Sequence, residues 1–403
     1  MFMQELSFRH SKLKFFSLGF SLYLTIIANF SACSEKPKKK VLDSVISLDF
    51  IAHKDSKTFP KGLWFTGLNF VNGGYLGRLD LETGSINRSL LKIGPDTIVL
   101  PDSTQDGLLL LNRGGQEALA RLVGVKAEME FTQSLPQWSN PQSVVRDSRG
   151  NIWVTFLELN EVRVYSPDLK NELAKVDLSN LGLKGIDGKG NADLGPMAMM
   201  DDKTIIIAAQ RLHREKSWSP VLFSGLALIN IDNFQLESTQ LVALPNPILL
   251  SKDRVHDQTI LIGRGDYVDP AGAMGQYAII NDKTLSLSSS TLLEGKVVAA
   301  DEGGRGDPPA LIVLYPSENK SCVQRGSIKI ICEINADNGG YVFSSIRQSG
   351  NIIFASYYGH QSSELWILTL PKEFSSSVSV TSTEVSLQKI PMDLPIFSLS
   401  FGP

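Results

Sequence analysis

Short hydrophobic runs alternate with polar turns along this chain, in a unit that recurs about every fifty residues from Lys61 onwards. Each unit has an apolar run, an acidic or glycine-bearing turn, a second run of strand-forming residues, and a third, alternating run. The clearest copy is SVVRDSRGNIWVTFLELNEVRVY, residues Ser143–Tyr165. A repeat of this length built only from strands is typical of the blades of a β-propeller. The sequence therefore predicts an all-β fold with a single β-propeller.

The units align as strands A to D, counted outwards from the axis of the propeller. The A strands should be short and buried, and the runs that fit are Asp96–Leu100, Ser143–Arg146, Pro196–Met200, Ile248–Leu250, Lys296–Ala300, Tyr341–Ile346 and Ile396–Phe401. Polar turns and B strands follow at Leu108–Leu111, Ile152–Phe156, Thr204–Ala209, Thr259–Ile262, Ala310–Leu314 and Ile352–Ser356. Alternating runs then predict C strands at Glu161–Tyr165, Leu226–Ile231, Tyr277–Ile280, Ser327–Ile331 and Glu364–Leu368.

The two ends of this pattern complete each other. Ile396–Phe401 is an A strand with no B strand after it, whereas Gly62–Leu68 and Tyr75–Leu81 read as B and C strands with no A strand before them. We therefore expect the C-terminal strand to pair into the first blade and close the ring, which removes exposed sheet edges. The prediction is seven blades of four antiparallel strands, with six blades as the alternative. Ser44–Ala52 reads as a further strand without an assigned place.

The N-terminus has the composition of an export signal. A basic segment precedes the apolar stretch Phe15–Phe30, which is short for a bilayer span, and small residues then precede Cys33. This order resembles a bacterial lipoprotein signal, which implies a signal peptide over 1–32, a lipid (palmitate) on Cys33, a tether over 33–43 and the propeller over 44–403. An ordinary secretory signal and an uncleaved anchor are the alternatives. Ser34 in place of an aspartate favours the outer membrane of the cell envelope.

The cysteine count and the charge add two expectations. With Cys33 assigned to the lipid, Cys322 and Cys332 remain, and an even remainder in an exported protein predicts a disulfide. The formal net charge is −3, and both signs of charge are spread along the chain, so no basic face suggests a nucleic-acid partner. We expect a monomer that meets the membrane through its lipid.

The segment DSRGNIWVTF within Ser143–Tyr165 resembles the NHL and YVTN-type propeller repeats of bacteria. The stretch from Val176 to Asp232 is similar to that of bacterial propeller lipoproteins. The resemblance implies fold and location. Because those families contain lyases and lactonases as well as binding modules, it implies no reaction.

Long loops gather on one side of the predicted ring, which carries the B–C loops and the D-to-A crossovers. The excursions are Leu181–Gly195, Arg211–Gly225, Arg264–Gly275 and Pro316–Gly326, and loop length on a rigid scaffold marks a binding face. B strands of three blades end in Arg113, Arg211 and Arg264, so their guanidinium groups are candidates for binding an anionic ligand. Pairing of each arginine with a nearby acid is the alternative. The other ligand-binding candidates are Asp266, Tyr267, Tyr358 and His360.

Catalytic and metal motifs are scarce in the sequence. The histidines outside the signal fall in separate segments, and no nucleophile elbow or phosphate loop is present. Asp187 and Asp193 flank a glycine-rich segment that resembles a calcium loop, but Lys189 occupies the place of a ligand oxygen. A plain crossover is therefore favoured over a Ca²⁺ site, and no other cofactor is expected.

The tripeptide Arg-Gly-Asp occurs twice, at Arg264–Asp266 and Arg305–Asp307. Chance readily produces this tripeptide in turn-rich chains.

These observations favour a lipid-anchored binding module over an enzyme. The expected ligand or partner protein meets the face with the long B–C loops. The alternative is a propeller hydrolase or lyase, similar to a lactonase, with a divalent metal in the central opening and Glu158, Asp187 and Asp193 as its acids.

Overall fold

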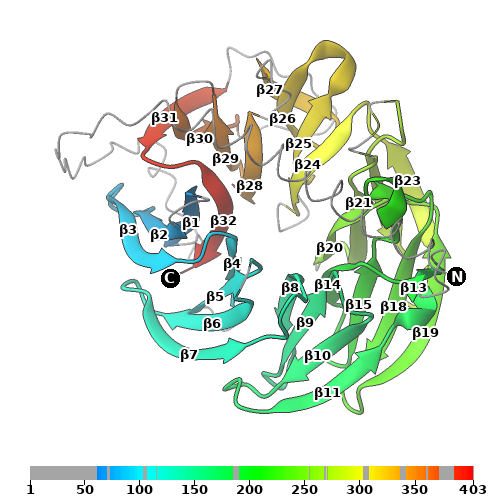
Figure 1. The fold of residues 1–403 in the computed structure, drawn as a ribbon. Coiled ribbons are helices and arrows are strands. Elements are labelled where there is room, and N and C mark those ends of the chain that lie inside the picture. The colour runs from blue at the N-terminus through cyan, green and yellow to red at the C-terminus, as the bar shows by residue number, and fades with distance from the viewer. Residues whose placement is uncertain are drawn as a thin grey trace, which may run out of the picture. The chain divides into compact units, whose positions relative to one another are not determined.

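The computed structural model is a ring of seven four-stranded antiparallel sheets (Figure 1), which confirms the predicted seven-bladed propeller. It describes residues 61–69, 73–102, 107–114, 116–184, 190–253, 255–266, 269, 271–302, 308–335, 342–359, 362–371 and 385–402. The predicted signal peptide, Cys33, the tether and Ser44–Ala52 lie outside these residues. Within them, no helix has the length and the apolar character needed to span a bilayer.

Each blade contributes its A strand to the inside of the ring and its D strand to the outside, and we number the blades from the one that contains β1. Blade 1 has β32 (Ile396–Gly402), β1 (Gly62–Asn69), β2 (Gly73–Asp80) and β3 (Ile86–Ile93). Blade 2 has β4 (Thr97–Pro101), β5 (Gly107–Asn112), β6 (Ala118–Val123) and β7 (Glu128–Ser134). Blade 3 has β8 (Pro141–Arg146), β9 (Ile152–Phe156), β10 (Glu161–Tyr165) and β11 (Glu172–Asp177).

The remaining blades follow in chain order. Blade 4 has β14 (Leu194–Met199), β15 (Thr204–Ala209), β18 (Ser224–Asn230) and β19 (Gln235–Val242). Blade 5 has β20 (Pro247–Asp253), β21 (Gln258–Gly263), β22 (Gln276–Ile280) and β23 (Leu287–Leu292). Blade 6 has β24 (Lys296–Asp301), β25 (Ala310–Tyr315), β26 (Lys320–Arg325) and β27 (Ile328–Ile334). Blade 7 has β28 (Phe343–Ser349), β29 (Ile352–Tyr358), β30 (Ser363–Thr369) and β31 (Ser386–Met392).

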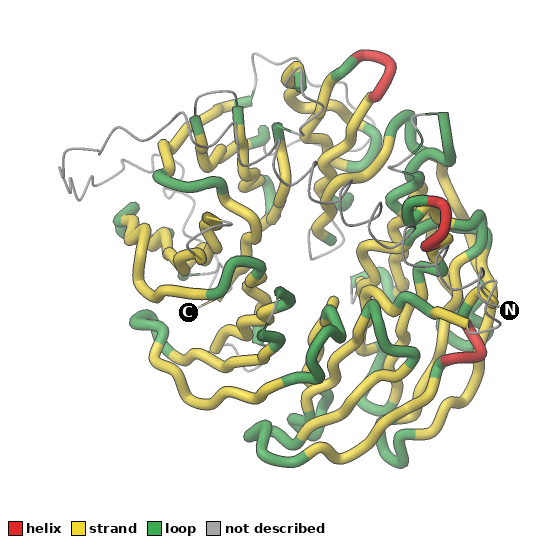
Figure 2. The backbone as a smooth tube through the Cα atoms, viewed as in Figure 1, coloured by secondary structure: helices red, strands yellow, loops and turns green. Residues whose placement is uncertain are grey.

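Short elements decorate the connections between these strands. Two small hairpins join β12 (Leu183–Lys184) to β13 (Gly190–Asn191) and β16 (Leu212–His213) to β17 (Ser219–Pro220). Figure 2 shows three helical turns among the strands: η2 (Ser179–Leu181), η3 (Arg214–Lys216) and η4 (Pro316–Glu318). All three lie in B–C loops or in a D-to-A crossover, so the irregular structure gathers on one side of the ring.

The ring closes as the sequence predicts. β32 pairs antiparallel with β1, in a register that places Leu63 opposite Phe401 and Phe65 opposite Leu399. The last strand of the chain is therefore the innermost strand of the first blade. This pairing covers the edge of β1 that faces the axis, so blade 1 has four strands like the other blades.

The hydrophobic core lies between neighbouring blades, where the faces of two sheets pack against each other. Each buried cluster combines residues of two adjacent blades; Trp153 of blade 3, for example, shares a cluster with Ile205 and Ile207 of blade 4. Strand residues therefore bury both faces, which explains the near-continuous apolar B strands such as IWVTF.

The turn between the A and B strands of blade 3 explains why aspartate recurs there. The Asp147 carboxylate accepts hydrogen bonds from the backbone N–H groups of Arg149 and Asn151 at 2.9 and 2.8 Å, and from the Trp153 indole at 2.9 Å. Gly150 takes φ +85° in the same turn. One acidic side chain thus holds the turn and orients the buried tryptophan of the next strand.

The prediction for the outer half of blade 6 is wrong. Ser327–Ile331 was expected to form the C strand after a long loop, but the C strand is β26 (Lys320–Arg325), and Ile328 begins the D strand. The B–C connection is only η4 and Asn319, which takes φ +49°. Polar residues disguise β26: Ser321 and Gln324 are buried, and they bond to Asn335 at 2.5 Å and to Tyr315 at 3.0 Å.

The predicted disulfide is confirmed. Cys322 and Cys332 are directly opposite each other on β26 and β27, and their sulfur atoms are bonded. The bond therefore fastens the two outermost strands of blade 6 to each other rather than closing a surface loop.

Candidate functional site

The candidate site is the loop face, which we define as the side of the ring formed by the B–C loops and the D-to-A crossovers. In blade 4 its B–C loop runs over 210–223 and carries β16, η3 and β17; in blade 5 the B–C loop spans 264–275. Both loops are much longer than the turns on the opposite side, such as Asp201–Lys203. Long loops on a regular scaffold are typical of a binding face, so the loop face is the candidate site.

A buried ion-pair network holds the blade 4 loop to blade 3. The Arg214 guanidinium donates to Asp193 at 2.6 and 3.0 Å, to the Leu157 carbonyl at 2.9 Å, and to Glu158. The Arg214 guanidinium also lies 4.6 Å from the centre of the Trp218 ring. Asp193 is fully buried and additionally accepts the Leu212 N–H at 2.7 Å. Burial raises the pKa of Asp193, against the opposing effects of Leu212 and Arg214.

A second network holds the same loop to blades 5 and 6. The Ser219 hydroxyl donates to the Asp266 carboxylate at 2.5 Å. The buried Lys296 ammonium, at the start of β24, donates to the backbone carbonyls of Asp266 and Asp269. Burial lowers the pKa of Lys296, and the two nearby aspartates oppose this shift. Together the two networks link the loops of blades 3, 4, 5 and 6 into one rigid surface.

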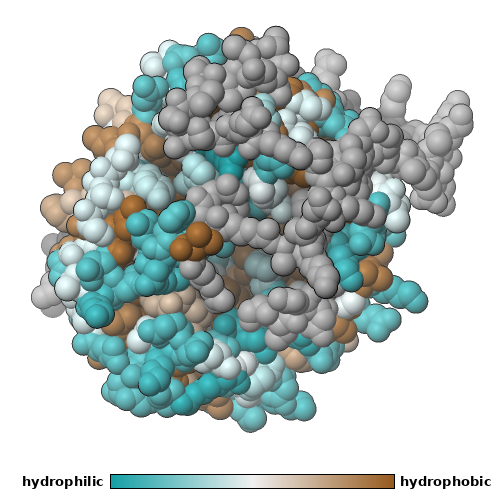
Figure 3. All heavy atoms as spheres, turned by 180° about the vertical axis from the view of Figure 1, so that it is seen from behind, coloured by the Kyte–Doolittle hydropathy of each residue, from teal (hydrophilic) through white to brown (hydrophobic). Residues whose placement is uncertain are grey.

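Large hydrophobic side chains stay exposed on this surface. Trp138, in the crossover from blade 2 to blade 3, is 70% exposed, and Leu222 and Phe223 of the blade 4 loop are 67% and 48% exposed. Strand ends on the same side add Tyr75, Leu241, Leu292, Ile334 and Tyr358, whereas the other exposed large hydrophobics of the described residues are Val125, Met129, Leu173 and Val255. On the side of the ring opposite to Figure 1, hydrophilic and hydrophobic atoms are interspersed (Figure 3). Exposed apolar groups on a rigid surface are typical of a contact site.

The three predicted arginines lie on the loop face, but blade 3 separates Arg113 from the other two. Arg113 donates to Asp96 at 2.8 and 3.2 Å and lies 5.4 Å from the centre of the Phe397 ring on blade 1. Arg264 donates to the Val298 carbonyl on blade 6 at 3.3 Å. Each of these side chains turns towards an inner strand of its own or the next blade, so the geometry resembles loop fastening more than a ring of free cations.

Arg211 differs from the other two arginines. It donates to the Phe223 carbonyl at 3.0 Å, and among the described residues it has no carboxylate partner. Its Nε atom is buried without a hydrogen-bond partner within the described part of the chain. Burial lowers the pKa of Arg211. Arg211 therefore keeps capacity to bind an anionic group beside exposed Phe223.

The remaining predicted site residues differ in whether solvent reaches them. Tyr358 is 40% exposed at the end of β29, and Asp266 is buried under Ser219. The carboxylate of the tripeptide Arg264–Asp266 is therefore turned into the protein, where an external receptor does not reach it. Four of the predicted features lie outside the described residues: Tyr267, His360, Asp187 and the tripeptide Arg305–Asp307.

Two of the three acids considered for a metal site, Glu158 and Asp193, are paired with an arginine. Both Asp193 and Glu158 bond to Arg214, whose positive charge occupies the place that a cation would take. In the described part of the chain, no group of three or more His, Cys, Asp or Glu side chains is arranged to hold a metal ion. These residues fit a structural network better than a cation site.

The sequence reading missed Arg214, Lys296 and Trp138. Arg214 sits inside a loop with no repeat position to mark it, and Lys296 is at the first residue of an A strand, where a buried charge is unusual. Trp138 takes φ +63° in a crossover that no pattern singles out. A lone tryptophan in a polar crossover was the one available signal.

No protein-family model and no curated protein sequence matches this chain. Solved structures match its fold: the β-propeller domain of Cps50 (Swd1) from Myceliophteria thermophila has 8% identity and a TM-score of 0.53 over 76% of this chain and 97% of that chain. The C-terminal WD40 domain of Sif2 has 10% identity and a TM-score of 0.50 over 85% and 83% of the two chains. Virginiamycin B lyase from Staphylococcus aureus has 11% identity and a TM-score of 0.47 over 74% and 93%.

These similarities show a β-propeller fold and nothing finer. One propeller scaffold supports many unrelated activities, so the fold by itself indicates none of them. The resemblance to NHL-type bacterial lipoproteins stays a prediction.

Proposed function

We propose that this protein is a lipid-anchored binding module of the cell envelope, which docks a partner protein on its loop face. The observation that carries the proposal is the combination of loops held by buried hydrogen bonds and ion pairs with exposed apolar side chains. Arg214 and Lys296 fasten the loops of blades 3 to 6, while Trp138, Leu222 and Phe223 remain exposed beside them. Pre-organised aromatic and aliphatic groups lose little conformational entropy on binding, which favours association.

The chemistry of the surface suggests the kind of partner segment. Leu222 and Phe223 offer apolar contacts, and Arg211 bonds to the carbonyl of Phe223 while keeping donor capacity. A partner segment with an apolar side chain next to a carboxylate would satisfy both features. The arginines proposed for a small anionic ligand thus reduce to one, Arg211, with Arg113 and Arg264 as loop fasteners.

Photo-crosslinking in the producing cell tests the docking surface. A photoreactive amino acid at Leu222 or Trp138 should give a discrete adduct with one protein, and the same amino acid at Val125, on the opposite side of blade 2, should not. Phe223→Ala should weaken the crosslink at Leu222 at least about tenfold, since a hot-spot side chain is worth about 2 kcal/mol. Equal crosslinking from Val125, or none from either loop position, contradicts the proposal.

The lipid anchor needs a separate test, because it rests on the sequence alone. Cells fed with labelled palmitate should label the wild-type protein but not the Cys33→Ala variant, and the variant should leave the membrane fraction. Variant protein that still partitions with membranes would refute lipidation without affecting the docking proposal.

A further inference from the structure

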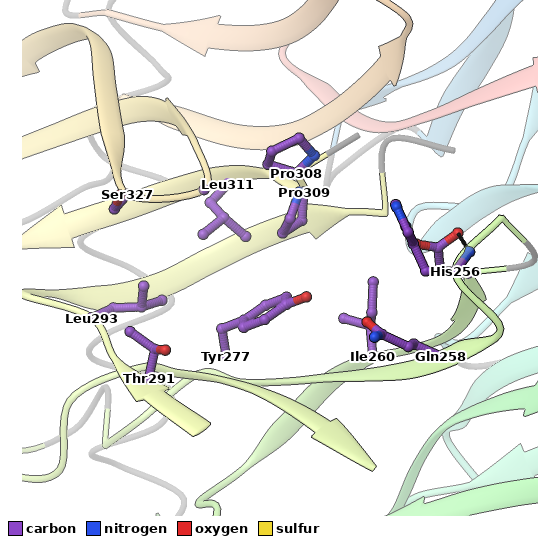
Figure 4. Close-up of a pocket in the computed structure, with 12 residues that line it drawn as sticks. His256, Gln258, Ile260, Tyr277, Thr291, Leu293, Pro308, Pro309, Leu311 and Ser327 are labelled. Atoms are coloured by element: carbon purple, nitrogen blue, oxygen red, sulfur yellow. Dashed lines mark hydrogen bonds and ion pairs between the residues drawn. The ribbon is translucent and has the colours of Figure 1, made fainter. Parts of the chain in front are cut away.

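A cleft of about 390 Å³ opens between the sheets of blades 5 and 6. Its walls are apolar: Tyr277 of β22 faces Leu311 and the pair Pro308 and Pro309 across the cleft (Figure 4). Polar groups stand at its two ends, His256 with Gln258 at one and Thr291 with Ser327 at the other (Figure 4). This volume and this mixture of apolar walls with a few polar groups are typical of sites for small molecules.

The C–D turn of blade 6 differs from those of four other blades, which pack a side chain against the neighbouring sheet. In the C–D turns of blades 2, 3, 4 and 5, a residue with φ between +55° and +59° inserts its side chain against the preceding blade; these residues are Ala127, Leu169, Phe234 and Leu285. Phe234, for example, lies 5.8 Å from Trp153 of blade 3. The C–D turn of blade 6 has only Gly326 and Ser327; its left-handed residue is Gly326, with φ +57°, and it lines the cleft.

Gly326 therefore contributes no side chain to the cleft that it lines. A Cβ atom built on Gly326 would meet the Cβ atom of Pro308 at 3.3 Å, directly at the cleft wall. In blade 1 the turn also has a glycine, Gly84, but buried Leu81 and Ile86 occupy that interface.

One end of the cleft has a defined hydrogen-bonding arrangement. The Asp253 carboxylate accepts a hydrogen bond from Nδ1 of His256 at 2.8 Å. This leaves Nε2 of the imidazole for a ligand. Asp253 and His256 both line the cleft, together with the Gln258 amide. At the other end, the hydroxyls of Thr291 and Ser327 donate or accept equally well.

We propose that this cleft binds a flat, elongated aromatic molecule that carries a hydroxyl group at each end. The aromatic body would lie between the Tyr277 ring and the Pro308–Pro309 wall, where offset stacking and apolar burial favour it. One hydroxyl meets His256 and Gln258, and the other meets Thr291 and Ser327. The site is independent of the loop face and of the partner proposed for it.

Titration calorimetry with three matched compounds tests the shape and the polarity of the site. The compounds are biphenyl, 4-hydroxybiphenyl and 4,4′-dihydroxybiphenyl, used on the purified propeller. Each hydroxyl should tighten binding about fivefold, the factor expected for one net hydrogen bond. His256→Ala should remove one such factor for the diol and leave biphenyl unchanged.

Two substitutions locate the binding. Thr291→Trp places a bulky side chain at the mouth of the cleft, and Ser290→Trp is its control, because neighbouring residues of a strand point to opposite sides of the sheet. Gly326→Leu copies the residue found at the equivalent turns of blades 3 and 5. Thr291→Trp and Gly326→Leu should weaken diol binding at least about tenfold, and Ser290→Trp should not change it.

Three results would overturn the proposed binding site in the cleft. Binding of the diol that survives both Thr291→Trp and Gly326→Leu overturns the assignment, as does biphenyl that binds as tightly as the diol. Absence of saturable binding for all three compounds up to about 1 mM, where a site of this size should be occupied, overturns it as well.

Discussion

At the scale of single residues, burial decides what each charge does. Asp193 and Arg149 illustrate the range: the first is fully buried and bonded to Arg214, whereas the second is half exposed and paired with Asp232. Removing one partner of a buried pair leaves the other charge without compensation, but an exposed pair is screened by water. The same type of contact therefore has very different effects on stability.

Arg214→Met should lower the free energy of unfolding by about 3 kcal/mol, because it leaves Asp193 buried without its cation. Denaturant unfolding followed by tryptophan fluorescence measures the loss. Arg149→Met is the matched control and should cost less than about 1 kcal/mol, since its partner Asp232 is exposed. Equal losses in the two variants would contradict a structural role for Arg214.

Asp168, in the C–D turn of blade 3, makes a pH-dependent contribution. The Ser166 hydroxyl and the Lys170 backbone and side chain lower the pKa of Asp168 to about 2 from its ordinary value of 3.8. A depressed folded-state pKa stabilises the fold above 3.8 and loses this effect as the pH falls towards about 2. Asp168→Asn should therefore be less stable than the wild type at pH 6, and this gap should be largely lost at pH 2, measured by unfolding at both values. A stability gap that is constant with pH would rule out the predicted ionisation.

At the scale of elements, strand identity in blade 6 was the hardest to predict. β26 has the sequence KSCVQR, whose polar residues suggest a loop, yet its side chains are buried and bonded within the blade. The alternation that sequence reading relies on assumes that polar positions face water. Where a polar residue is buried with a partner, as Gln324 is with Tyr315, that assumption fails.

The disulfide acts on the same element. Replacing Cys322 and Cys332 together by alanine should cost about 2–3 kcal/mol, because the bond restricts the unfolded chain over a short loop. Unfolding with and without a thiol reductant measures the effect on the wild type, and the double variant should show no response to the reductant. Wild type that is equally stable in both conditions would show that the hairpin of β26 and β27 needs no covalent support.

At the scale of the whole molecule, ion pairs join inner strands across blade boundaries at equivalent places. Arg146 of blade 3 donates to buried Asp102 of blade 2 at 2.8 and 3.1 Å, and Arg347 of blade 7 donates to Asp301 of blade 6 at 3.3 Å. In both cases an acid at the end of one A strand meets an arginine of the next. The ring is thus fastened near its axis at two well-separated interfaces.

Arg146→Met and Arg347→Met should each destabilise the ring by about 1–3 kcal/mol, because Arg121 still pairs with Asp102 after the first change and the Gln348 N–H still bonds to Asp301 after the second. The two interfaces share no residue, so the double variant should lose the sum of the single losses within about 0.5 kcal/mol. Chemical denaturation of the four proteins measures this sum. A large deviation from this sum would mean that closure of the ring couples distant blades.

The sequence by itself determined the repeat, and with it the seven blades, the closing strand Ile396–Phe401 and the disulfide. These follow from local periodicity and from pairing rules that need no distant contact. Only the tertiary structure decided which charges are buried partners. Arg113 pairs with Asp96 and Arg214 with Asp193, because residues far apart in the chain meet in the folded ring.

The loop face and the cleft also differ in how much of each the sequence indicates. Long loops marked the loop face in the sequence, but its exposed Trp138 and its fastened Arg214 emerged from the fold. The cleft beside Tyr277 is lined by a glycine at one turn, Gly326, whose meaning appears only when the turns of neighbouring blades are compared in space. Periodicity along the chain fixes where strands run, whereas the space between two sheets is set by side chains from both.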